Sequence, residues 1–237
     1  KAFSRLDPIF ERFARERHTP GMVFGVVADG KLAYVKTFGV QDTASRRPVT
    51  PDSVFRIASM SKNFTALAVL KLRDEGKLSL DAPVETIVPE FAALAYPTAD
   101  SPKIRVRDLL NHAGGFVTDD PWGDRQLDMA EDQFSALIKA GLPFSRAPGM
   151  AMEYSNLGYA VLGRVVTNAS GRPYSAYIGE TILSPLRMSA STYDVAAIPA
   201  ERRALGYDWI DGKWVEEPVL GPGAFGAMGG LAVSAND

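Results

Sequence analysis

The chain contains one Ser-x-x-Lys sequence, formed by Ser59 and Lys62. It lies where a run with helical periodicity begins, so we expect the hydroxyl and the amine one turn apart on the same side of a helix N-terminus. There the amine can take the hydroxyl proton or hold a neighbouring base in its reactive form, while the helix dipole favours developing negative charge. The spacing indicates a serine nucleophile. The alternative is a Ser that caps the helix, followed by a Lys on the helix surface.

A second pair of reactive side chains begins 95 residues after Ser59, in the chain's one Tyr-x-Asn sequence, Tyr154 to Asn156. Alternate residues of an extended segment point the same way, so both side chains can face one cleft. A phenol beside an ammonium can lose its proton well below its usual pKa of about 10 and act as a general base. The Asn amide offers a donor and an acceptor to a substrate amide. The alternative is a Tyr packed in the core and an Asn that caps the next helix.

The hydrophobic pattern predicts the elements that position these side chains. Residues 61–75 read as a buried helix that ends at Gly76, and residues 156–169 as a helix that ends before Gly171. Asp-Gly pairs between strand-like runs predict hairpins at 22–38 and 207–215, and the first reads as buried on both faces. Further helices are predicted around Leu6, Phe10 and Phe13 and at 106–111, 126–140 and 174–183, and 221–230 reads as a Gly-rich loop.

Composition excludes several classes of protein. The 237 residues are 46% hydrophobic and 23% charged, as in a globular chain. A net charge of −2 without a basic run predicts no nucleic-acid partner. No apolar stretch approaches the ~20 residues of a membrane span. With no Cys and only His18 and His112, neither a metal site nor a thiolate-held cofactor is expected. The compartment stays open, with a periplasmic or secreted location favoured over a cytoplasmic one.

The order of the two motifs resembles the serine β-lactamase and penicillin-binding-protein superfamily. The resemblance is to its class C-like branch, which includes class C β-lactamases, D-Ala-D-Ala carboxypeptidases, D-aminopeptidases and esterases. It extends across nearly the whole chain. The segments that carry it are residues 55–62 around the nucleophile, 78–83, 107–115 (RDLLNHAGG), 148–149, 154–159, 162–163, 184–188 (SPLRM) and 229–231.

The resemblance implies an α+β fold of the β-lactamase/transpeptidase type, in which a helical cluster packs on a helix-flanked antiparallel sheet with strands from both ends of the sequence. Residues 1–50 would begin the sheet domain, 51–170 would form the mainly helical domain with both motifs, and 171–237 would return toward the sheet. Two isolated hairpins and a helix-cap sequence at 234–237 suggest the front part of a longer protein, without the last sheet strands.

The resemblance also implies roles for residues at matching positions. Ser59 would be the acylated nucleophile, Lys62 and Tyr154 would move its proton, and no cofactor or metal would be needed. Asn156 would bind a substrate amide, while Trp122 would either rim the cleft or anchor its loop. We therefore predict a serine hydrolase that forms an acyl-enzyme with a small-molecule or peptide substrate: an ester, a D-amino-acid peptide or a β-lactam.

One departure concerns the family's third motif, Lys-Thr-Gly or His-x-Gly. No Lys-Thr-Gly occurs, and His112-Ala113-Gly114 precedes Tyr154 and belongs to another family segment, so we do not take it as that motif. The strand that carries the third motif supplies an oxyanion-hole donor, and loss of one such donor can cost about 10²–10³ in rate. The rival hypothesis is a non-catalytic penicillin-binding or scaffold member of the same fold.

Two smaller features have structural explanations. The acidic loop 119–125 lacks the spacing of a calcium-binding loop and reads as a solvated turn. Tyr207, Trp209 and Trp214 alternate along the second hairpin, where we expect cross-strand packing rather than a substrate pocket.

Overall fold

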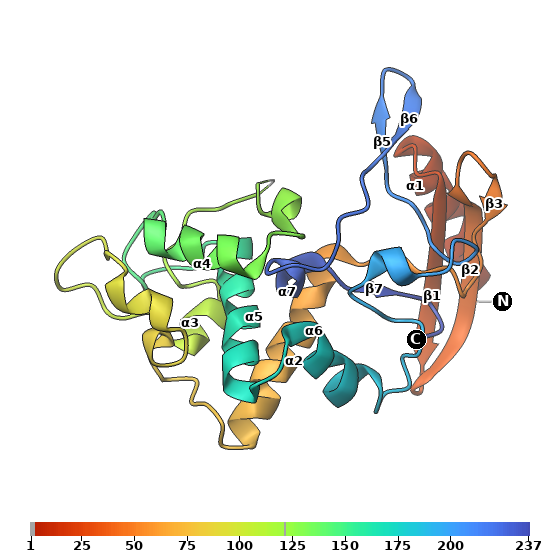
Figure 1. Cartoon of the computed structure of the whole chain (residues 1–237). Helices are drawn as coiled ribbons and strands as arrows, with labels where there is room; N and C mark the ends of the chain where they lie inside the picture. Colours follow the sequence, from red (N-terminus) through yellow and green to blue (C-terminus); the bar gives the residue numbers. More distant parts are fainter. Residues whose placement is uncertain (1–2, 121) are drawn as a thin grey trace. The chain divides into compact units, whose positions relative to one another are not determined.

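The structure, a computed structural model, describes residues 3–120 and 122–237. The chain forms two compact units (Figure 1). The sheet unit comprises the described chain up to Arg56 together with Met188–Leu220 and Ala232–Asp237, and the helical unit comprises Ile57–Arg187 and Gly221–Leu231. We expected the stretch 171–237 to form one segment that returns to the sheet. In the structure, this stretch is divided between the two units.

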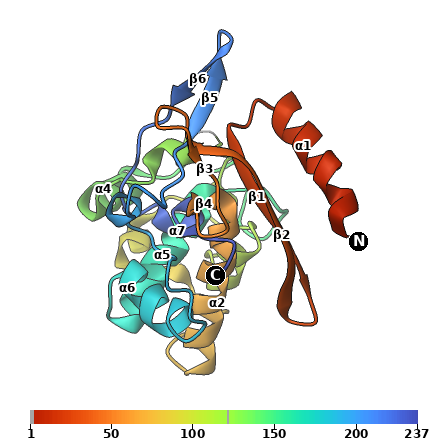
Figure 2. The same ribbon diagram turned by 90° about the vertical axis from the view of Figure 1, so that its right-hand side faces the viewer.

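An antiparallel hairpin is the largest element of the sheet unit (Figure 2). β1 (Gly21–Ala28) pairs with β2 (Lys31–Asp42), which also pairs with β3 (Arg47–Pro48). At the turn, Asp29 has a φ of 51° and Gly30 a φ of 71°, the left-handed conformation that a two-residue hairpin turn requires. The hairpin predicted from the Asp-Gly pair is therefore confirmed.

Helix α1 (Asp7–Glu16) packs beside this hairpin. Phe10 stacks on Phe24 with ring centroids 4.0 Å apart, and the Tyr34 hydroxyl donates to the Asp7 carboxylate at 2.6 Å. Val27 is nevertheless 71% exposed. The prediction that the strands are buried on both faces is therefore wrong, because the helix covers the aromatic side chains and leaves this position open.

Two shorter strand pairs complete the sheet unit. β4 (Phe55–Arg56) pairs with β7 (Ala232–Val233), and β5 (Tyr207–Ile210) pairs with β6 (Lys213–Glu216). Trp209 lies opposite Trp214 in edge contact, with ring centroids 5.3 Å apart, and also stacks on His18. The predicted cross-strand packing is confirmed. Short 3₁₀ turns occupy Phe3–Leu6 and Val195–Ala197.

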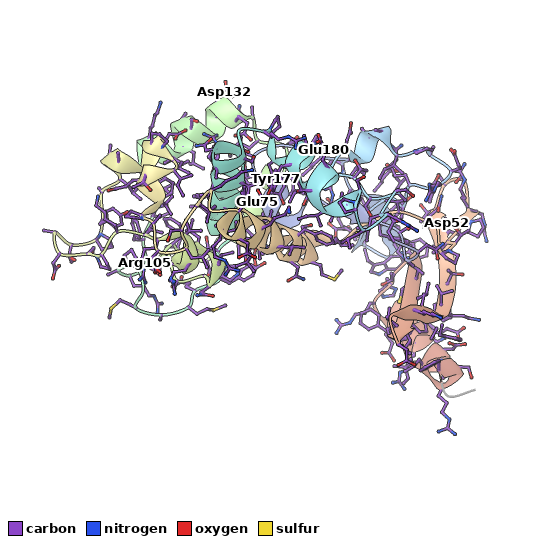
Figure 3. The ribbon with its side chains drawn as sticks, turned by 90° about the horizontal axis from the view of Figure 1, so that it is seen from below. Asp52, Glu75, Arg105, Asp132, Tyr177 and Glu180 are labelled. Atoms are coloured by element: carbon purple, nitrogen blue, oxygen red, sulfur yellow. The ribbon has the colours of Figure 1, made fainter. Side chains whose placement is uncertain are left out.

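Two long helices lie side by side at the centre of the helical unit, α2 (Ser61–Asp74) and α5 (Asn156–Ser170) (Figure 1). α6 (Tyr174–Ile178) packs against both, and Figure 3 shows Tyr177 of α6 beside Glu75 at the end of α2. The other helices of this unit are α3 (Val106–Leu110), α4 (Glu131–Ala140), α7 (Gly226–Gly229), 3₁₀ turns at Ala58–Met60, Val84–Thr86, Pro89–Ala93 and Gly123–Gln126, and a π turn at Gly179–Leu183. Its largest fully buried side chains include Leu72, Phe91, Phe116, Phe134, Leu162 and Phe225.

Three sequence predictions for the helical unit need correction. α4 begins at Glu131 rather than at 126, because residues 123–126 form a separate 3₁₀ turn and Ala130 is extended. The stretch 221–230 is not only a loop, since it contains α7. α2 is not buried all round, because Leu67 is 47% exposed. Among the described residues, no helix combines the length and apolar character needed to cross a membrane.

Helix α7 meets α5 where α5 carries no side chain. A Cβ added to Gly163 would lie 2.7 Å from the Cβ of Ala227, closer than two carbon atoms can pack. Nearer the start of α5, a Cβ added to Gly158 would meet its nearest atoms at 3.8 Å, which is ordinary contact. Gly163 therefore permits the close approach of the two helices, whereas Gly158 does not limit packing.

We expect Gly163→Ala to destabilise the protein by about 1–3 kcal/mol, because the overpacking penalty exceeds the gain in helix propensity. The matched control Gly158→Ala should be neutral or slightly stabilising. Adding Ala227→Gly to Gly163→Ala should recover most of the loss. Urea titrations give the free energy of unfolding of the wild type, the two single Gly variants and the double variant. Equal stability of the two single Gly variants would contradict this account of the contact.

Candidate active site

Ser59 lies in the 3₁₀ turn Ala58–Met60, immediately before α2, and its side chain is exposed. The preceding residue, Ala58, has a φ of 46°, in the left-handed region that residues with a Cβ rarely adopt. Such a conformation costs of order 1–2 kcal/mol. The strained backbone presents the Ser59 hydroxyl at the start of the helix, as the Ser-x-x-Lys spacing predicts.

The Lys62 ammonium is buried in the first turn of α2, with 6% of the residue exposed. Its Nζ donates to Ser59 Oγ at 3.1 Å, to Asn156 Oδ1 at 2.8 Å and to the Met228 carbonyl of α7 at 2.8 Å. These three acceptors match the three N–H groups of an ammonium. Lys62 therefore does not lie on the helix surface, and its geometry is fixed by three separate elements.

Tyr154 approaches Ser59 from the other side, just before α5 begins. Its Oη lies 2.7 Å from Ser59 Oγ, and its ring centroid is 4.9 Å from Lys62 Nζ. The Ser59 oxygen thus contacts both an amine and a phenol. Because the Lys62 ammonium already donates three hydrogen bonds and has no lone pair, the group in contact that can accept the Ser59 proton in this geometry is the Tyr154 oxygen, in its deprotonated form.

His112 holds Tyr154 in place, a role that the sequence reasoning missed. His112 lies after the end of α3. This helix is capped at its N-terminus, where the backbone N–H of Arg105, labelled in Figure 3, donates to the Asp108 carboxylate. The Ser155 N–H donates to His112 Nδ1 at 3.2 Å, and the Glu153 N–H donates to the His112 carbonyl at 2.8 Å.

The His112 ring also packs on the ring of Tyr154, with centroids 4.6 Å apart. An accepting Nδ1 requires a neutral imidazole with its proton assigned to Nε2. Burial, together with the positive charge of Lys62, lowers the pKa of His112 and favours the same neutral form. The sequence contained little to indicate this contact, because it showed only that His112 follows the helix predicted at 106–111.

Asn156 is the first residue of α5 and is fully buried. Ser155 caps this helix by accepting from the Gly158 N–H at 3.1 Å. Asp119 accepts from the backbone N–H groups of Asn156 and Leu157, at 2.8 and 2.7 Å. The capping alternative was therefore assigned to the wrong side chain, because Ser155 and Asp119 cap α5 while the Asn156 side chain contacts Lys62.

Asp120 and Gly123 of the acidic loop lie against the Asn156 side chain. Asp120 accepts a hydrogen bond from Asn156 Nδ2, and a Cβ on Gly123 would lie 2.7 Å from the Asn156 Cβ. The prediction of a merely solvated turn is therefore incomplete. Two of the loop's carboxylates are bound to the start of α5.

Trp122 belongs to this loop but does not join the hydrogen-bonded group. It is 43% exposed, and its ring meets the ring of Phe225 edge-on with centroids 5.7 Å apart. This contact fits the anchoring alternative. Its role as a wall of the substrate cleft stays a prediction.

The neutral state of His112 predicts a pH dependence of stability. Lys62 and Asp119 are the charged groups that act on its pKa, and the net effect of burial and charge is to lower that pKa from 6.5. The unfolded chain therefore binds more protons just below pH 6.5, so the free energy of unfolding should fall as the pH drops through this range. In His112→Asn the fall should be smaller, whereas the exposed His18→Asn should retain it. Urea titrations at about pH 5 and about pH 7.5 give the change in the free energy of unfolding between the two pH values. An equal change in wild type and His112→Asn would refute the neutral state assigned to His112.

Comparisons with known proteins place the chain in a family. The chain is 33% identical over 228 residues to Esterase EstB of Burkholderia gladioli, covering 91% of this chain and 56% of the esterase. It is 30% identical over 206 residues to protein flp of Staphylococcus aureus, covering 86% of this chain and 41% of that protein. The chain thus spans about half the length of these curated relatives.

Solved structures show the same fold. An octameric penicillin-binding protein homologue from Pyrococcus abyssi superposes with a TM-score of 0.85 and 29% identity, over 99% of this chain and 54% of its own. A class C β-lactamase from Rhodobacter sphaeroides gives 0.79 and 26%, over 99% of this chain and 63% of its own. The predicted β-lactamase/transpeptidase-like fold is confirmed. The Beta-lactamase family model matches residues 6–237, and the chain belongs to this family.

Proposed function

We propose that the chain carries the acylation centre of a serine hydrolase. The observation that carries this proposal is the position of Ser59 Oγ, 2.7 Å from Tyr154 Oη and 3.1 Å from Lys62 Nζ. A nucleophile in contact with a general base, which is itself oriented by a third group, is the arrangement that covalent catalysis requires. Here His112 is the orienting group for Tyr154.

In the proposed reaction, Ser59 Oγ attacks the substrate carbonyl carbon while its proton passes to the Tyr154/Lys62 pair, which enters the reaction with one proton fewer than a phenol and an ammonium carry together. The tetrahedral intermediate collapses, the bond to the leaving group breaks, and the pair returns the proton to that group. Water then attacks the acyl-enzyme and transfers a proton to the same pair, and Ser59 regains its proton as the acid leaves. A positioned acid–base group of this kind contributes about 10²–10⁴ in rate. The side chains present need no cofactor for these steps.

The substrate is a carbonyl compound that can acylate a serine: an ester, a D-amino-acid peptide or a β-lactam. The esterase among the relatives favours an ester as the first substrate to test. The second candidate function is a non-catalytic penicillin-binding role, which the penicillin-binding protein homologue among the solved structures favours. Release of product in many turnovers, rather than one stable adduct per chain, separates the two.

A fluorophosphonate should add once per chain, at Ser59, and Ser59→Ala should abolish the adduct. Ser61 is the matched control, because it is buried and its Oγ accepts from the Leu231 N–H at 3.1 Å instead of facing Lys62. Ser61→Ala should lose about 1–3 kcal/mol of stability through the orphaned N–H but still be labelled. Intact-mass spectrometry measures the adduct. Labelling that survives Ser59→Ala and disappears in Ser61→Ala would show that the nucleophile is misassigned.

Tyr154→Phe removes the hydroxyl that contacts Ser59 and should lower turnover of an ester by about 10²-fold or more, with little change in melting temperature. Tyr159 provides the control, because its hydroxyl donates to the Leu110 carbonyl at 3.1 Å rather than to Ser59. Tyr159→Phe should cost about 1 kcal/mol of stability and keep most of the turnover. Single-turnover rates and thermal melts provide the two readouts. Full activity of Tyr154→Phe would exclude its role in proton transfer.

A further inference from the structure

Both ends of the Asn156 amide are occupied within the protein. Oδ1 accepts from Lys62 Nζ at 2.8 Å, and Nδ2 donates to Asp120 Oδ1. An ammonium can only donate and a carboxylate can only accept, so these two partners fix the orientation of the amide. No surface of Asn156 is exposed.

The loop that supplies Asp120 is anchored next to it. Asp119 accepts from two N–H groups at the start of α5, and the Gly123 N–H donates to the Asp119 carbonyl at 2.8 Å. Gly123 itself leaves no room for a Cβ against Asn156. The hydrogen bond from Asn156 to Asp120 is therefore held by the backbone around it.

Asn156 Nδ2 is the donor that the family resemblance offers to a substrate amide. To bind Nδ2, a substrate with an amide carbonyl beside the scissile carbonyl would have to displace the charged carboxylate of Asp120 and put its own neutral carbonyl oxygen in that place. Hydrogen bonds to an ionised group are about twice as strong as neutral ones, so this exchange is unfavourable. An acyl group without an amide needs no exchange.

The neighbouring charge acts in the same direction. Burial and the negative charges of Asp120 and Asp119 raise the pKa of Asp124, which lies in the same loop. Negative charge beside Asn156 opposes the approach of a carbonyl oxygen, which carries partial negative charge.

We propose that Asp120 is a specificity-determining residue, which engages Asn156 and so selects plain acyl esters over substrates with an acylamino group next to the scissile carbonyl. This inference rests on the proposed hydrolase function. Removal of the Asp120 carboxylate frees Nδ2, while Lys62 still holds Oδ1 and keeps the donor pointing toward the vacated position.

The test compares two esters with the same leaving group, p-nitrophenyl butyrate and the p-nitrophenyl ester of N-acetyl-D-alanine. In wild type, kcat/KM should favour the butyrate. Asp120→Ala should raise the ratio of acylamino to plain ester by about tenfold, and the isosteric Asp120→Asn, which keeps a neutral acceptor, by about threefold. Asp128→Asn removes an exposed carboxylate farther along the chain and should leave the ratio at its wild-type value.

A ratio that stays at the wild-type value in both Asp120 variants, with thermal melts that show folded protein, would overturn the inference. So would a wild-type protein that prefers the acylamino ester. A loss of rate that is equal for both esters would show that Asp120 only supports the fold around Lys62, and would overturn it too. Failure of the proposed function is distinct: the wild type would then hydrolyse neither ester and take no fluorophosphonate label.

Discussion

The buried ammonium of Lys62 is the constraint on which the site depends. A charged group removed from water is very costly unless hydrogen bonds replace its hydration. Lys62 obtains them from the Ser59 hydroxyl, the Asn156 amide and the Met228 carbonyl, all of which are uncharged. The nearest charge compensation along these bonds is Asp120, which reaches the ammonium through the Asn156 amide. Ser59, the proposed nucleophile, is therefore one of the three groups that make the burial of this lysine possible.

Close helix packing and left-handed backbone positions place the groups that contact Lys62 and Tyr154. Gly163 lets α7 approach α5, and this brings the Met228 carbonyl within reach of α2. Two residues with a Cβ, Ala58 and His112, are left-handed, with φ of 46° and 55°. Such conformations persist only when the structure around them determines them. One precedes the proposed nucleophile and the other holds the proposed base, whereas the other non-Gly residues with positive φ among the described residues, such as Arg46 and Arg187, lie outside the site.

Local patterns predicted the elements whose signals lie within a few residues. The first hairpin follows from its Asp-Gly turn, and α5 ends at Gly171, whose φ is 70°, as the pattern indicates. The start of α4 and the existence of α7 were not predicted, because a 3₁₀ turn and close packing against other helices override the local preference there. The exposure of Val27 was missed for a similar reason, since burial depends on what covers a strand.

The types of the candidate reactive residues and their order along the chain were sufficient to predict the family. It indicated that Ser59, Lys62, Tyr154 and Asn156 belong together. The folded chain was needed to show that Asp120 binds Asn156, that His112 positions Tyr154 and that a backbone carbonyl is the third acceptor for Lys62. These contacts join residues far apart in the chain and partly use backbone atoms common to every residue. Such contacts have no periodicity or composition of their own, so they cannot be predicted from a local sequence pattern.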